Sequence, residues 1–235
     1  MSAPSRSKEA SGLRILAFES SAKAASVAIL QDGALLGEYF QNSGQTHSRT
    51  LAKMAEDLLA NCDLTVADID AVAVAAGPGS FTGVRIGVAA AKGLAWAREL
   101  PCYGVSTLEA MVRGAAMCDG VYCACMDARR EQVYNAVFSV EDGKLLRLSE
   151  DRAISIEELG AELKNLEKAI FLVGDGAELC YNTLRVSIPA LCLLPEHLRG
   201  QHASGTALAA QAKIDAGEPG SGLELIPSYL RLSQA

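Results

Sequence analysis

The chain has 235 residues, half of them apolar, and its 21 Lys and Arg against 28 Asp and Glu give a net charge of −7. This length allows one large domain or two small lobes, and the apolar content is enough to bury a core. The acidic total argues against a dedicated nucleic-acid binder, which neutralises many phosphates with Lys and Arg. No run approaches the roughly 20 apolar residues of a membrane span.

The first ten residues lack the apolar core of a secretory signal, so we expect residues 1–12 to be a disordered tail on a cytoplasmic protein without membrane contact. Seven cysteines are scattered without a CxxC pair, and His47, His197 and His202 form no HxxH, HxxxH or HExxH pattern. Zinc sites in proteins use such spacings. We therefore predict no metal site and expect the cysteines to be buried free thiols.

Three antiparallel strands are predicted at the start of the chain. Residues 13–19 form an apolar run, residues 25–30 form a second and residues 34–40 a third. Asp32-Gly33 between the last two is a strong hairpin signal. The first half is then expected to continue with a helix over 48–62, an apolar central strand over 70–76, a helix from 81 to about 99, a strand over 102–105 and a helix capped by Ser106 with Glu109.

A composition shift near residues 119–120 divides the chain into an N-terminal lobe, 13–118, and a smaller C-terminal lobe, 119–235. Both halves contain strands followed by a helix and a strand, which indicates a duplicated α/β lobe. The elements expected in the second half are strands over 121–126 and 132–140, a hairpin at Asp142-Gly143, a helix capped by Ser155 with Glu158, a strand over 169–173 and a helix over 203–216.

Gly77-Pro78-Gly79-Ser80-Phe81-Thr82-Gly83 joins the buried strand to the second helix. Such a turn can direct backbone N–H groups and the helix dipole at an anion, with Gly77, Gly79, Ser80 and Thr82 as the contacting residues. It is neither a Walker loop, since GxxxxGK[ST] is missing, nor a Rossmann fingerprint, since its spacing is GxGxxxG. A tight strand-to-helix turn without a ligand is the alternative.

Gly83, Gly87 and Ala91 lie at i, i+4 and i+8 of the second helix, so they share one face with little side-chain bulk. Glycine inside a helix costs about 0.5–1 kcal/mol relative to alanine. Two glycines on one face therefore indicate that another backbone packs closely there. That neighbour is the 51–59 helix, the sheet or another subunit.

With these motifs identified, the chain resembles the TsaB (YeaZ) family of bacterial tRNA threonylcarbamoyladenosine synthesis. The 77–87 segment matches the family signature almost letter for letter. The other matching segments are Ile15–Ser21, His47-Ser48, Gly104–Leu108, Asp127-Ala128-Arg129, Val133-Tyr134, Gly174-Asp175-Gly176-Ala177 and Tyr229-Leu230-Arg231. A departure is Glu19, where the family usually has Asp.

The resemblance implies an actin/Hsp70/sugar-kinase-type (ASKHA) α/β fold, with two related lobes that each contain a mixed sheet flanked by helices. In catalytic members of that fold, two turns and a Gly-rich segment hold a nucleotide in the cleft. Here the matching segments contribute Asp127, Gly174 and Gly176 to the anion- or nucleotide-binding residues predicted above.

The resemblance also implies a non-catalytic role. TsaD, the catalytic relative, binds metal through two histidines four residues apart, and this sequence has Thr107 and Met111 there, which are poor ligands for such an ion. We therefore expect no catalytic residue, no cofactor and an accessory subunit that pairs with a TsaD-type subunit, with a TsaE-type ATPase as third member, and that contacts tRNA only through the complex. Alone, it would form a homodimer. The residues predicted for the interface are Leu51, Met54, Gly83, Gly87 and Ala91.

An active enzyme of the same fold is the alternative function. A nucleotide hydrolase or small-molecule kinase would need Mg²⁺ held by carboxylates, and Glu19 and Asp127 are the well-placed candidates. A metallopeptidase would need paired histidines, which the sequence lacks.

Overall fold

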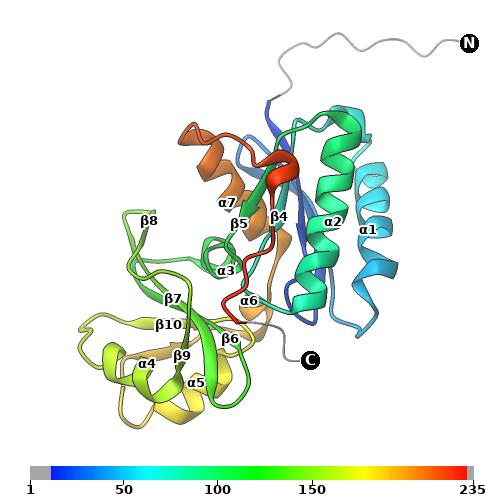
Figure 1. The fold of residues 1–235 in the computed structure, drawn as a ribbon. Helices are drawn as coiled ribbons and strands as arrows, with labels where there is room; N and C mark the ends of the chain where they lie inside the picture. The colour runs from blue at the N-terminus through cyan, green and yellow to red at the C-terminus, as the bar shows by residue number, and fades with distance from the viewer. Residues whose placement is uncertain (1–11, 232–235) are drawn as a thin grey trace, which may run out of the picture.

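The computed structural model of the protein describes residues 12–231. The predicted tail therefore lies, apart from Gly12, outside the described residues. Two α/β lobes are stacked one above the other in Figure 1, each built on its own sheet. This confirms the predicted fold class.

The first lobe contains a mixed sheet of five strands within residues 12–231, in the order β3-β2-β1-β4-β5. The first three strands are antiparallel, as predicted, while β4 and β5 run parallel to β1. The Asp32-Gly33 hairpin has φ of 50° and 80° at its two central residues, as a type I′ turn requires. The strands are β1 (Arg14–Glu19), β2 (Ala25–Gln31), β3 (Ala34–Gln41), β4 (Ala71–Ala75) and β5 (Cys102–Val105).

Helices cover both faces of this first sheet (Figure 1). Helices α1 (His47–Asn61) and α2 (Phe81–Arg98) pack on one face, and α7 (Ala203–Asp215) packs on the other. Every residue of β4 is buried, which explains its continuous apolar run. The short helix η1 (Val66–Asp68) leads into β4, and α3 (Thr107–Ala115) packs on both α7 and the second lobe.

The second lobe contains a sheet in the order β11-β10-β6-β7-β8, with β9 also paired to β7. Helices α4 and α5 pack on one face of this sheet around a separate core. Its elements are β6 (Gly120–Asp127), β7 (Gln132–Glu141), β8 (Lys144–Arg147), β9 (Arg152–Ser155), α4 (Ile156–Leu163), β10 (Ile170–Val173), α5 (Ala177–Leu184), β11 (Leu191–Leu193) and α6 (Glu196–Arg199).

The predicted helix caps are observed, one of them in part. Ser155 and Glu158 form a complete capping box. Ser106 accepts a hydrogen bond from the Glu109 N–H at 3.3 Å, but the Glu109 carboxylate instead pairs with Arg113 at 2.8 Å and Arg147 at 3.1 Å. That carboxylate thus joins α3 to the second sheet, because its charge finds stronger partners than a backbone N–H.

Helix α7 and the described residues after it return to the first lobe, which corrects the predicted C-terminal lobe of residues 119–235. Helix α7 packs on β1, β2 and β4, and its alanines let it lie close to the sheet. After it, η2 (Gly222–Glu224) leads into a segment that crosses α2, where Lys92 Nζ donates to the Leu225 carbonyl at 2.9 Å. These residues belong to the first lobe because of contacts with segments that are distant in the sequence. Local composition carries no sign of such contacts, so the sequence did not predict this placement.

The prediction of seven buried cysteines is confirmed at four positions and wrong at two, and Cys62 is half-buried. Cys102, Cys123, Cys125 and Cys180 are buried, whereas Cys118 and Cys192 are exposed. Within the described part of the chain, no helix is both long and apolar enough to cross a membrane.

Candidate functional site: the interlobe cleft and the α1–α2 face

The Gly77–Gly83 loop follows β4 and packs against the turn that follows β1. A Cβ on Gly79 would clash with the Ser21 carbonyl, and Ser80 N–H donates to the same oxygen at 2.6 Å. Gly77 has φ of 116°, which a side chain would strain, and its carbonyl accepts from Thr107 N–H at 2.9 Å. The glycines of the loop thus allow close backbone packing.

Ser80 caps helix α2 through a 3.3 Å hydrogen bond from Gly83 N–H to its hydroxyl. The N–H groups of Ser80 and Gly83 are therefore bonded within the protein, whereas Thr82 is exposed on the first turn of the helix. Two of the backbone donors that an anion would need are already occupied. This geometry favours the structural interpretation of the loop over a phosphate cradle.

The second lobe contributes two turns that pack on one another. Gly174, with φ of 108°, lies against the Cys125 carbonyl, and Gly176 N–H donates to that oxygen at 3.0 Å. A Cβ on Gly176 would lie 2.9 Å from the Asp127 backbone nitrogen. Asp127 in turn accepts from Arg129 N–H at 2.7 Å. The predicted Gly174 and Gly176 therefore hold the Asp127 turn in place.

These turns enclose a pocket of about 450 Å³ between the lobes. Of the seven residues predicted to bind an anion or nucleotide, Gly79, Ser80 and Asp127 line it. Gly77, Thr82, Gly174 and Gly176 are not among its lining residues. Sequence reasoning did not single out Asp175 or Lys23, which also line the pocket and whose signal was their place beside Gly174 and the β1–β2 turn.

The pocket contains features that a ligand would meet. The Ser21 hydroxyl is buried and has no hydrogen-bond partner within the described residues. Burial raises the pKa of Asp175, hydrogen bonds from Gln201 and backbone groups oppose that shift, and the nearby Asp127 carboxylate adds to it. Two carboxylates on one wall repel a phosphate unless a cation lies between them.

Glu19 does not join that wall. Its side chain is fully buried, accepting from Ser21 N–H at 2.6 Å and from the Thr206 hydroxyl of α7 at 3.5 Å. Burial raises its pKa to about 7, although the hydrogen bonds pull in the opposite direction. Within residues 12–231, no group of three or more His, Cys, Asp and Glu side chains is placed to hold a metal ion. The Glu19–Asp127 magnesium site that the alternative function needs is therefore poorly supported.

Thr107 and Met111 occupy the first two turns of α3, and both are buried. The Thr107 hydroxyl has no partner among the described residues, and the Met111 methyl group packs beside Gly174. A hydroxyl and a thioether in this setting are weak ligands for a hard or borderline divalent cation.

The five residues predicted for a partner interface lie inside the first lobe, which corrects their placement. Leu51 and Met54 face the sheet, and Ala91 is fully buried. A Cβ on Gly83 would clash with the Ser20 carbonyl, and one on Gly87 would lie 2.5 Å from Ser20 Oγ. The close backbone neighbour of the small-residue face is therefore the turn after β1.

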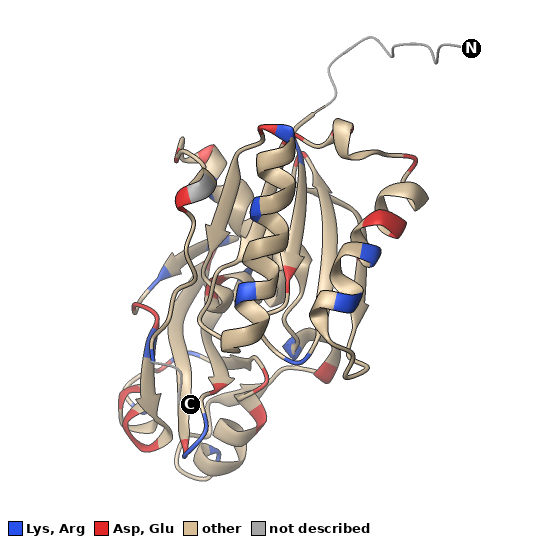
Figure 2. Ribbon diagram, turned by 45° about the vertical axis from the view of Figure 1, so that its right-hand side comes forward, with Lys and Arg blue, Asp and Glu red and all other residues tan. Residues whose placement is uncertain are grey.

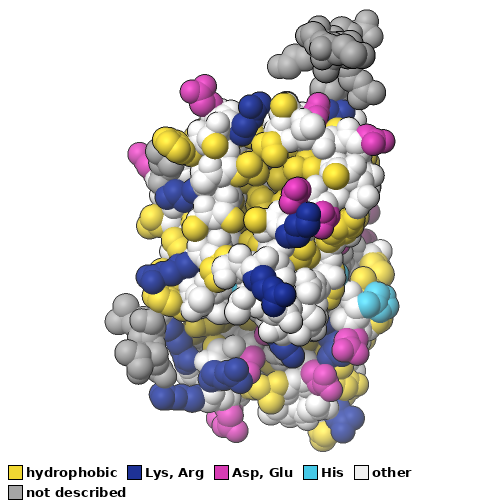
Figure 3. Space-filling view, turned by 90° about the vertical axis from the view of Figure 1, so that its right-hand side faces the viewer, with side chains coloured by type: hydrophobic (Ala, Val, Ile, Leu, Met, Phe, Trp, Pro, Cys, Tyr) yellow, Lys and Arg dark blue, Asp and Glu magenta, His cyan; other side chains and the backbone are white. Residues whose placement is uncertain are grey.

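The surface between α1 and α2 is formed by other residues of the same helices. They line an apolar groove of about 700 Å³, which we call the α1–α2 groove. Figure 3 shows hydrophobic side chains gathered on this face of the molecule. Its outward-facing residues include Ala52 and Ala60 of α1 and Ala89, Gly93 and Ala97 of α2.

Comparison with known proteins identifies the family. A family model described as "TsaD: tRNA N6-adenosine threonylcarbamoyltransferase" matches residues 38–214. The "tRNA threonylcarbamoyladenosine biosynthesis protein TsaB" of Bacillus subtilis (strain 168) is 30% identical over 226 residues, which cover 95% of this chain and 96% of the relative. The chain belongs to the TsaB family.

Further matches agree with this assignment. The protein of the same name from Escherichia coli (strain K12) is 36% identical over 167 residues, or 70% of this chain and 72% of the relative. Among solved structures, "YeaZ from Pseudomonas aeruginosa" superposes with a TM-score of 0.73 at 25% identity, covering 93% of this chain and all of that one. The (R)-2-hydroxyglutaryl-CoA dehydratase component A of Acidaminococcus fermentans, with a TM-score of 0.53 at 13% identity, shares the fold alone.

Proposed function

We propose that this chain is a non-catalytic accessory subunit in tRNA threonylcarbamoyladenosine biosynthesis. It binds a TsaD-type catalytic subunit in the cytoplasm and enables transfer of the threonylcarbamoyl group to the adenosine beside the anticodon. A TsaE-type ATPase completes the assembly, and the complex brings the tRNA. The names of the full-length relatives support the pathway, and the α1–α2 groove is the observation that supports docking.

The composition of the α1–α2 groove suits helix-on-helix packing. Helix α2 carries only three charged residues, Arg85, Lys92 and Arg98, and Figure 2 shows long uncharged stretches between them. Alanines and Gly93 on the outer faces let a second pair of helices approach closely. On the rim, Lys53 pairs with Glu56 at 3.1 Å and with Asp57 at 2.8 Å, which gives the groove a charged border. An apolar centre with a polar rim is the usual anatomy of a protein interface.

A TsaD-type partner follows from shared ancestry. The TsaD family model matches most of this chain, so a TsaD-type protein has equivalents of α1 and α2. Two such helix pairs can face one another about a pseudo-two-fold axis, as an isologous interface requires. The same geometry accounts for a homodimer when the partner is absent.

The environment of Thr107 and Met111 supports the non-catalytic assignment, since the metal ligands of the catalytic relative are replaced by buried weak donors. The chemistry then belongs to the partner. Reconstituted threonylcarbamoylation tests this proposal. We expect modification with the TsaD-type and TsaE-type subunits only when this chain is added, and no modification by this chain alone. Equal modification in its absence would refute the accessory role.

The interlobe pocket leaves a second candidate, an active nucleotide hydrolase or small-molecule kinase. About 450 Å³ lies within the size range of ligand sites, and the unpartnered Ser21 hydroxyl is a free polar group there. Calorimetry of the isolated chain with ATP and Mg²⁺ separates the two functions. Tight binding with turnover would favour this candidate, and heats no larger than dilution would exclude it.

A further inference from the structure

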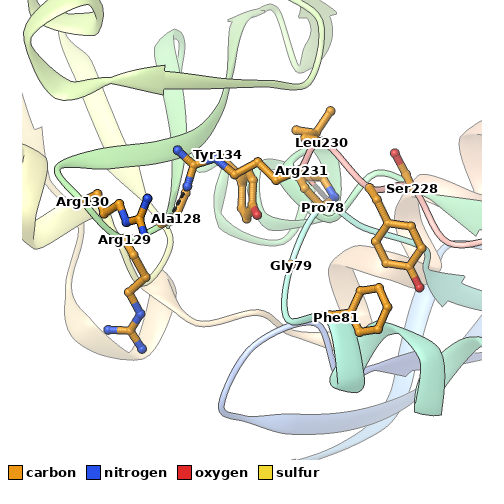
Figure 4. Close-up of a pocket in the computed structure, with 11 residues that line it drawn as sticks. Pro78, Gly79, Phe81, Ala128, Arg129, Arg130, Tyr134, Ser228, Leu230 and Arg231 are labelled. Atoms are coloured by element: carbon orange, nitrogen blue, oxygen red, sulfur yellow. Dashed lines mark hydrogen bonds between the residues drawn. The ribbon is translucent and has the colours of Figure 1, made fainter. Parts of the chain in front are cut away.

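A second pocket lies where the lobes meet, close to the one described above, and residues 228–231 form part of its lining (Figure 4). Three separate segments form it: the start of α2, the β6–β7 turn and residues 228–231. Its volume is about 200 Å³, smaller than the pockets that enclose a drug-sized ligand. A site of this size encloses part of one unit of a longer ligand.

One side of this pocket is basic. Arg129 and Arg130 extend from the β6–β7 turn, and Arg231 approaches from the C-terminal segment (Figure 4). Arg231 is held by a 2.7 Å hydrogen bond to the Ala128 carbonyl, while Arg129 makes an open 3.4 Å pair with Asp127. Three guanidinium groups around one small pocket are notable in a chain with a net charge of −7. Planar guanidinium groups match phosphate oxygens in geometry as well as in charge.

The other side is aromatic. The Phe81 and Tyr229 rings lie 4.9 Å apart and both line the pocket, and Figure 4 shows Phe81 away from the arginines of the β6–β7 turn. Arg85 fixes this pair, since its guanidinium lies 3.7 Å from the Phe81 ring centroid and its Nε donates to the Tyr229 hydroxyl at 2.8 Å. Tyr229 remains 39% exposed, so it has surface available for stacking. Aromatic side chains bind bases by stacking with little dependence on sequence.

We propose that this pocket binds one nucleotide of a single-stranded RNA segment, with the phosphate at Arg129 and Arg130 and the base against Phe81 and Tyr229. A strand fits better than a free nucleotide because the pocket is too small to enclose a whole nucleotide and the Arg129 side chain is 86% exposed beyond it. The acidic remainder of the chain excludes a broad footprint on a duplex, but not a contact with one or two phosphates. The inference does not depend on pairing with a TsaD-type subunit.

The test compares two double variants of the full-length chain that lose the same charge. Arg129→Gln with Arg130→Gln removes two of the three guanidinium groups on the basic side, and Arg98→Gln with Arg185→Gln removes two exposed arginines elsewhere. The probe is a fluorescein-labelled, unstructured ten-nucleotide RNA, followed by anisotropy over a salt series. We expect the pocket variant to bind at least about tenfold more weakly and its salt slope to fall by about 0.7, the value for one phosphate contact with a single strand. The remote variant should bind as the wild type does.

Tyr229 tests the aromatic side. Tyr229→Leu should weaken binding about tenfold because leucine cannot stack on a base. Tyr229→Trp should retain binding because tryptophan stacks, although it cannot accept the hydrogen bond from Arg85. Circular dichroism and thermal melting of each variant establish that it is folded. If Trp and Leu weaken binding alike, the tyrosine acts through Arg85 and the stacking role is refuted.

Three results would overturn the proposal: no binding of the RNA by the wild type, equal weakening in both double variants, or competition by AMP as strong as that by unlabelled RNA at equal nucleotide concentration. The first excludes the site, the second shows non-specific attraction, and the third identifies a free nucleotide as the ligand. Co-purification of the same variants with a TsaD-type subunit measures the pairing function independently. A failure of the RNA-binding proposal can thus be distinguished from a failure of the proposed pairing.

Discussion

Arg231 donates a 2.7 Å hydrogen bond from Nη1 to the carbonyl oxygen of Ala128, and this contact joins the two lobes. Arg231 ends a segment that packs on the first lobe, where Ser228 N–H donates to the Ala76 carbonyl at 2.7 Å. Ala128 belongs to the β6–β7 turn of the second lobe. Arg231 thus positions the turn that carries Asp127 and Arg129.

Replacing Arg231 should loosen that turn. Arg231→Met keeps the apolar stem but removes the charged donor, and hydrogen bonds from charged groups contribute about 1.5–3 kcal/mol. We expect a loss of about 1–2 kcal/mol in the free energy of unfolding, measured in urea, since the site is partly exposed. Hydrogen–deuterium exchange should rise in residues 127–131 more than in β1. Unchanged exchange there would show that Arg231 does not hold the turn.

Buried Glu19 should make stability depend on pH. Its pKa is about 7 in the folded protein and 4.5 in the unfolded chain. Between these values the folded state binds the extra proton, so stability falls as pH rises through this window and levels off above pH 7. At 1.36 kcal/mol per unit, the fall is about 3 kcal/mol.

The Glu19→Gln variant isolates this effect, because it keeps the acceptor oxygen and removes the titration. Relative to the wild type, the variant should gain about 3 kcal/mol between pH 4 and pH 8 in urea unfolding. A stability difference that is constant across that range would mean that the pKa of Glu19 is the same in the folded protein as in the unfolded chain.

Glu38 and His202 anchor the start of α7. Glu38 lies 3.4 Å from His202 Nδ1 and accepts from the Ser204 N–H at 3.0 Å and from the Ser26 hydroxyl at 2.9 Å. Burial would raise the pKa of Glu38, but its hydrogen bonds to His202, Ser204 and Ser26 and the His202 charge lower it overall. The hydrogen bond to Glu38 is the main cause of the raised pKa of His202.

The signs of these shifts define a pH window. The contribution of Glu38 is present above its unfolded pKa of 4.5, and that of His202 is present below 6.5 and is lost as pH rises through its folded pKa. A double-mutant cycle with Glu38→Gln and His202→Asn should give a coupling energy of about 1 kcal/mol at pH 5.5 and a smaller one at pH 8.5. A larger coupling energy at pH 8.5 would contradict the assignment.

Two glycines of α2 should respond in opposite directions to alanine. A Cβ at Gly93 meets no atom within 4 Å, so Gly93→Ala should stabilise the fold by about 0.5–1 kcal/mol. A Cβ at Gly87 lies 2.5 Å from Ser20 Oγ and 3.3 Å from Val74, so Gly87→Ala should destabilise it by about 1–3 kcal/mol. Urea unfolding measures both. Stabilisation by both variants would mean that the Ser20 turn yields freely.

Local patterns predicted most elements of the fold. Asp32-Gly33, the continuous apolar run of β4 and the caps at Ser106 and Ser155 each act within a few residues, so the sequence reveals them directly. The return of α7 and residues 222–231 to the first lobe depends on packing between segments more than 100 residues apart. Helix α7 is apolar on several faces, which is typical of burial but does not identify the neighbour.

The candidate site was predicted less completely. The sequence located the turns that contain Gly79, Asp127 and Gly174, because glycines and short polar residues follow buried strands there. It did not indicate which side of α2 faces the core, since the Gly83–Gly87 spacing fits contact with a turn as well as with a subunit. The pocket beside Tyr229 was also missed, because its walls come from three segments distant in the sequence.

Docking through the α1–α2 groove is the central claim, and a charge placed in the groove tests it most directly. Ala89 is exposed and lines the groove, whereas Ala161 is exposed on α4 of the other lobe. An arginine is placed at each of these two positions, and calorimetry measures the affinity of each variant for the TsaD-type subunit. Ala89→Arg should weaken binding at least about 100-fold, because an unpaired charge buried in an interface costs several kcal/mol, and Ala161→Arg should bind as the wild type does. Wild-type affinity for Ala89→Arg would contradict the account.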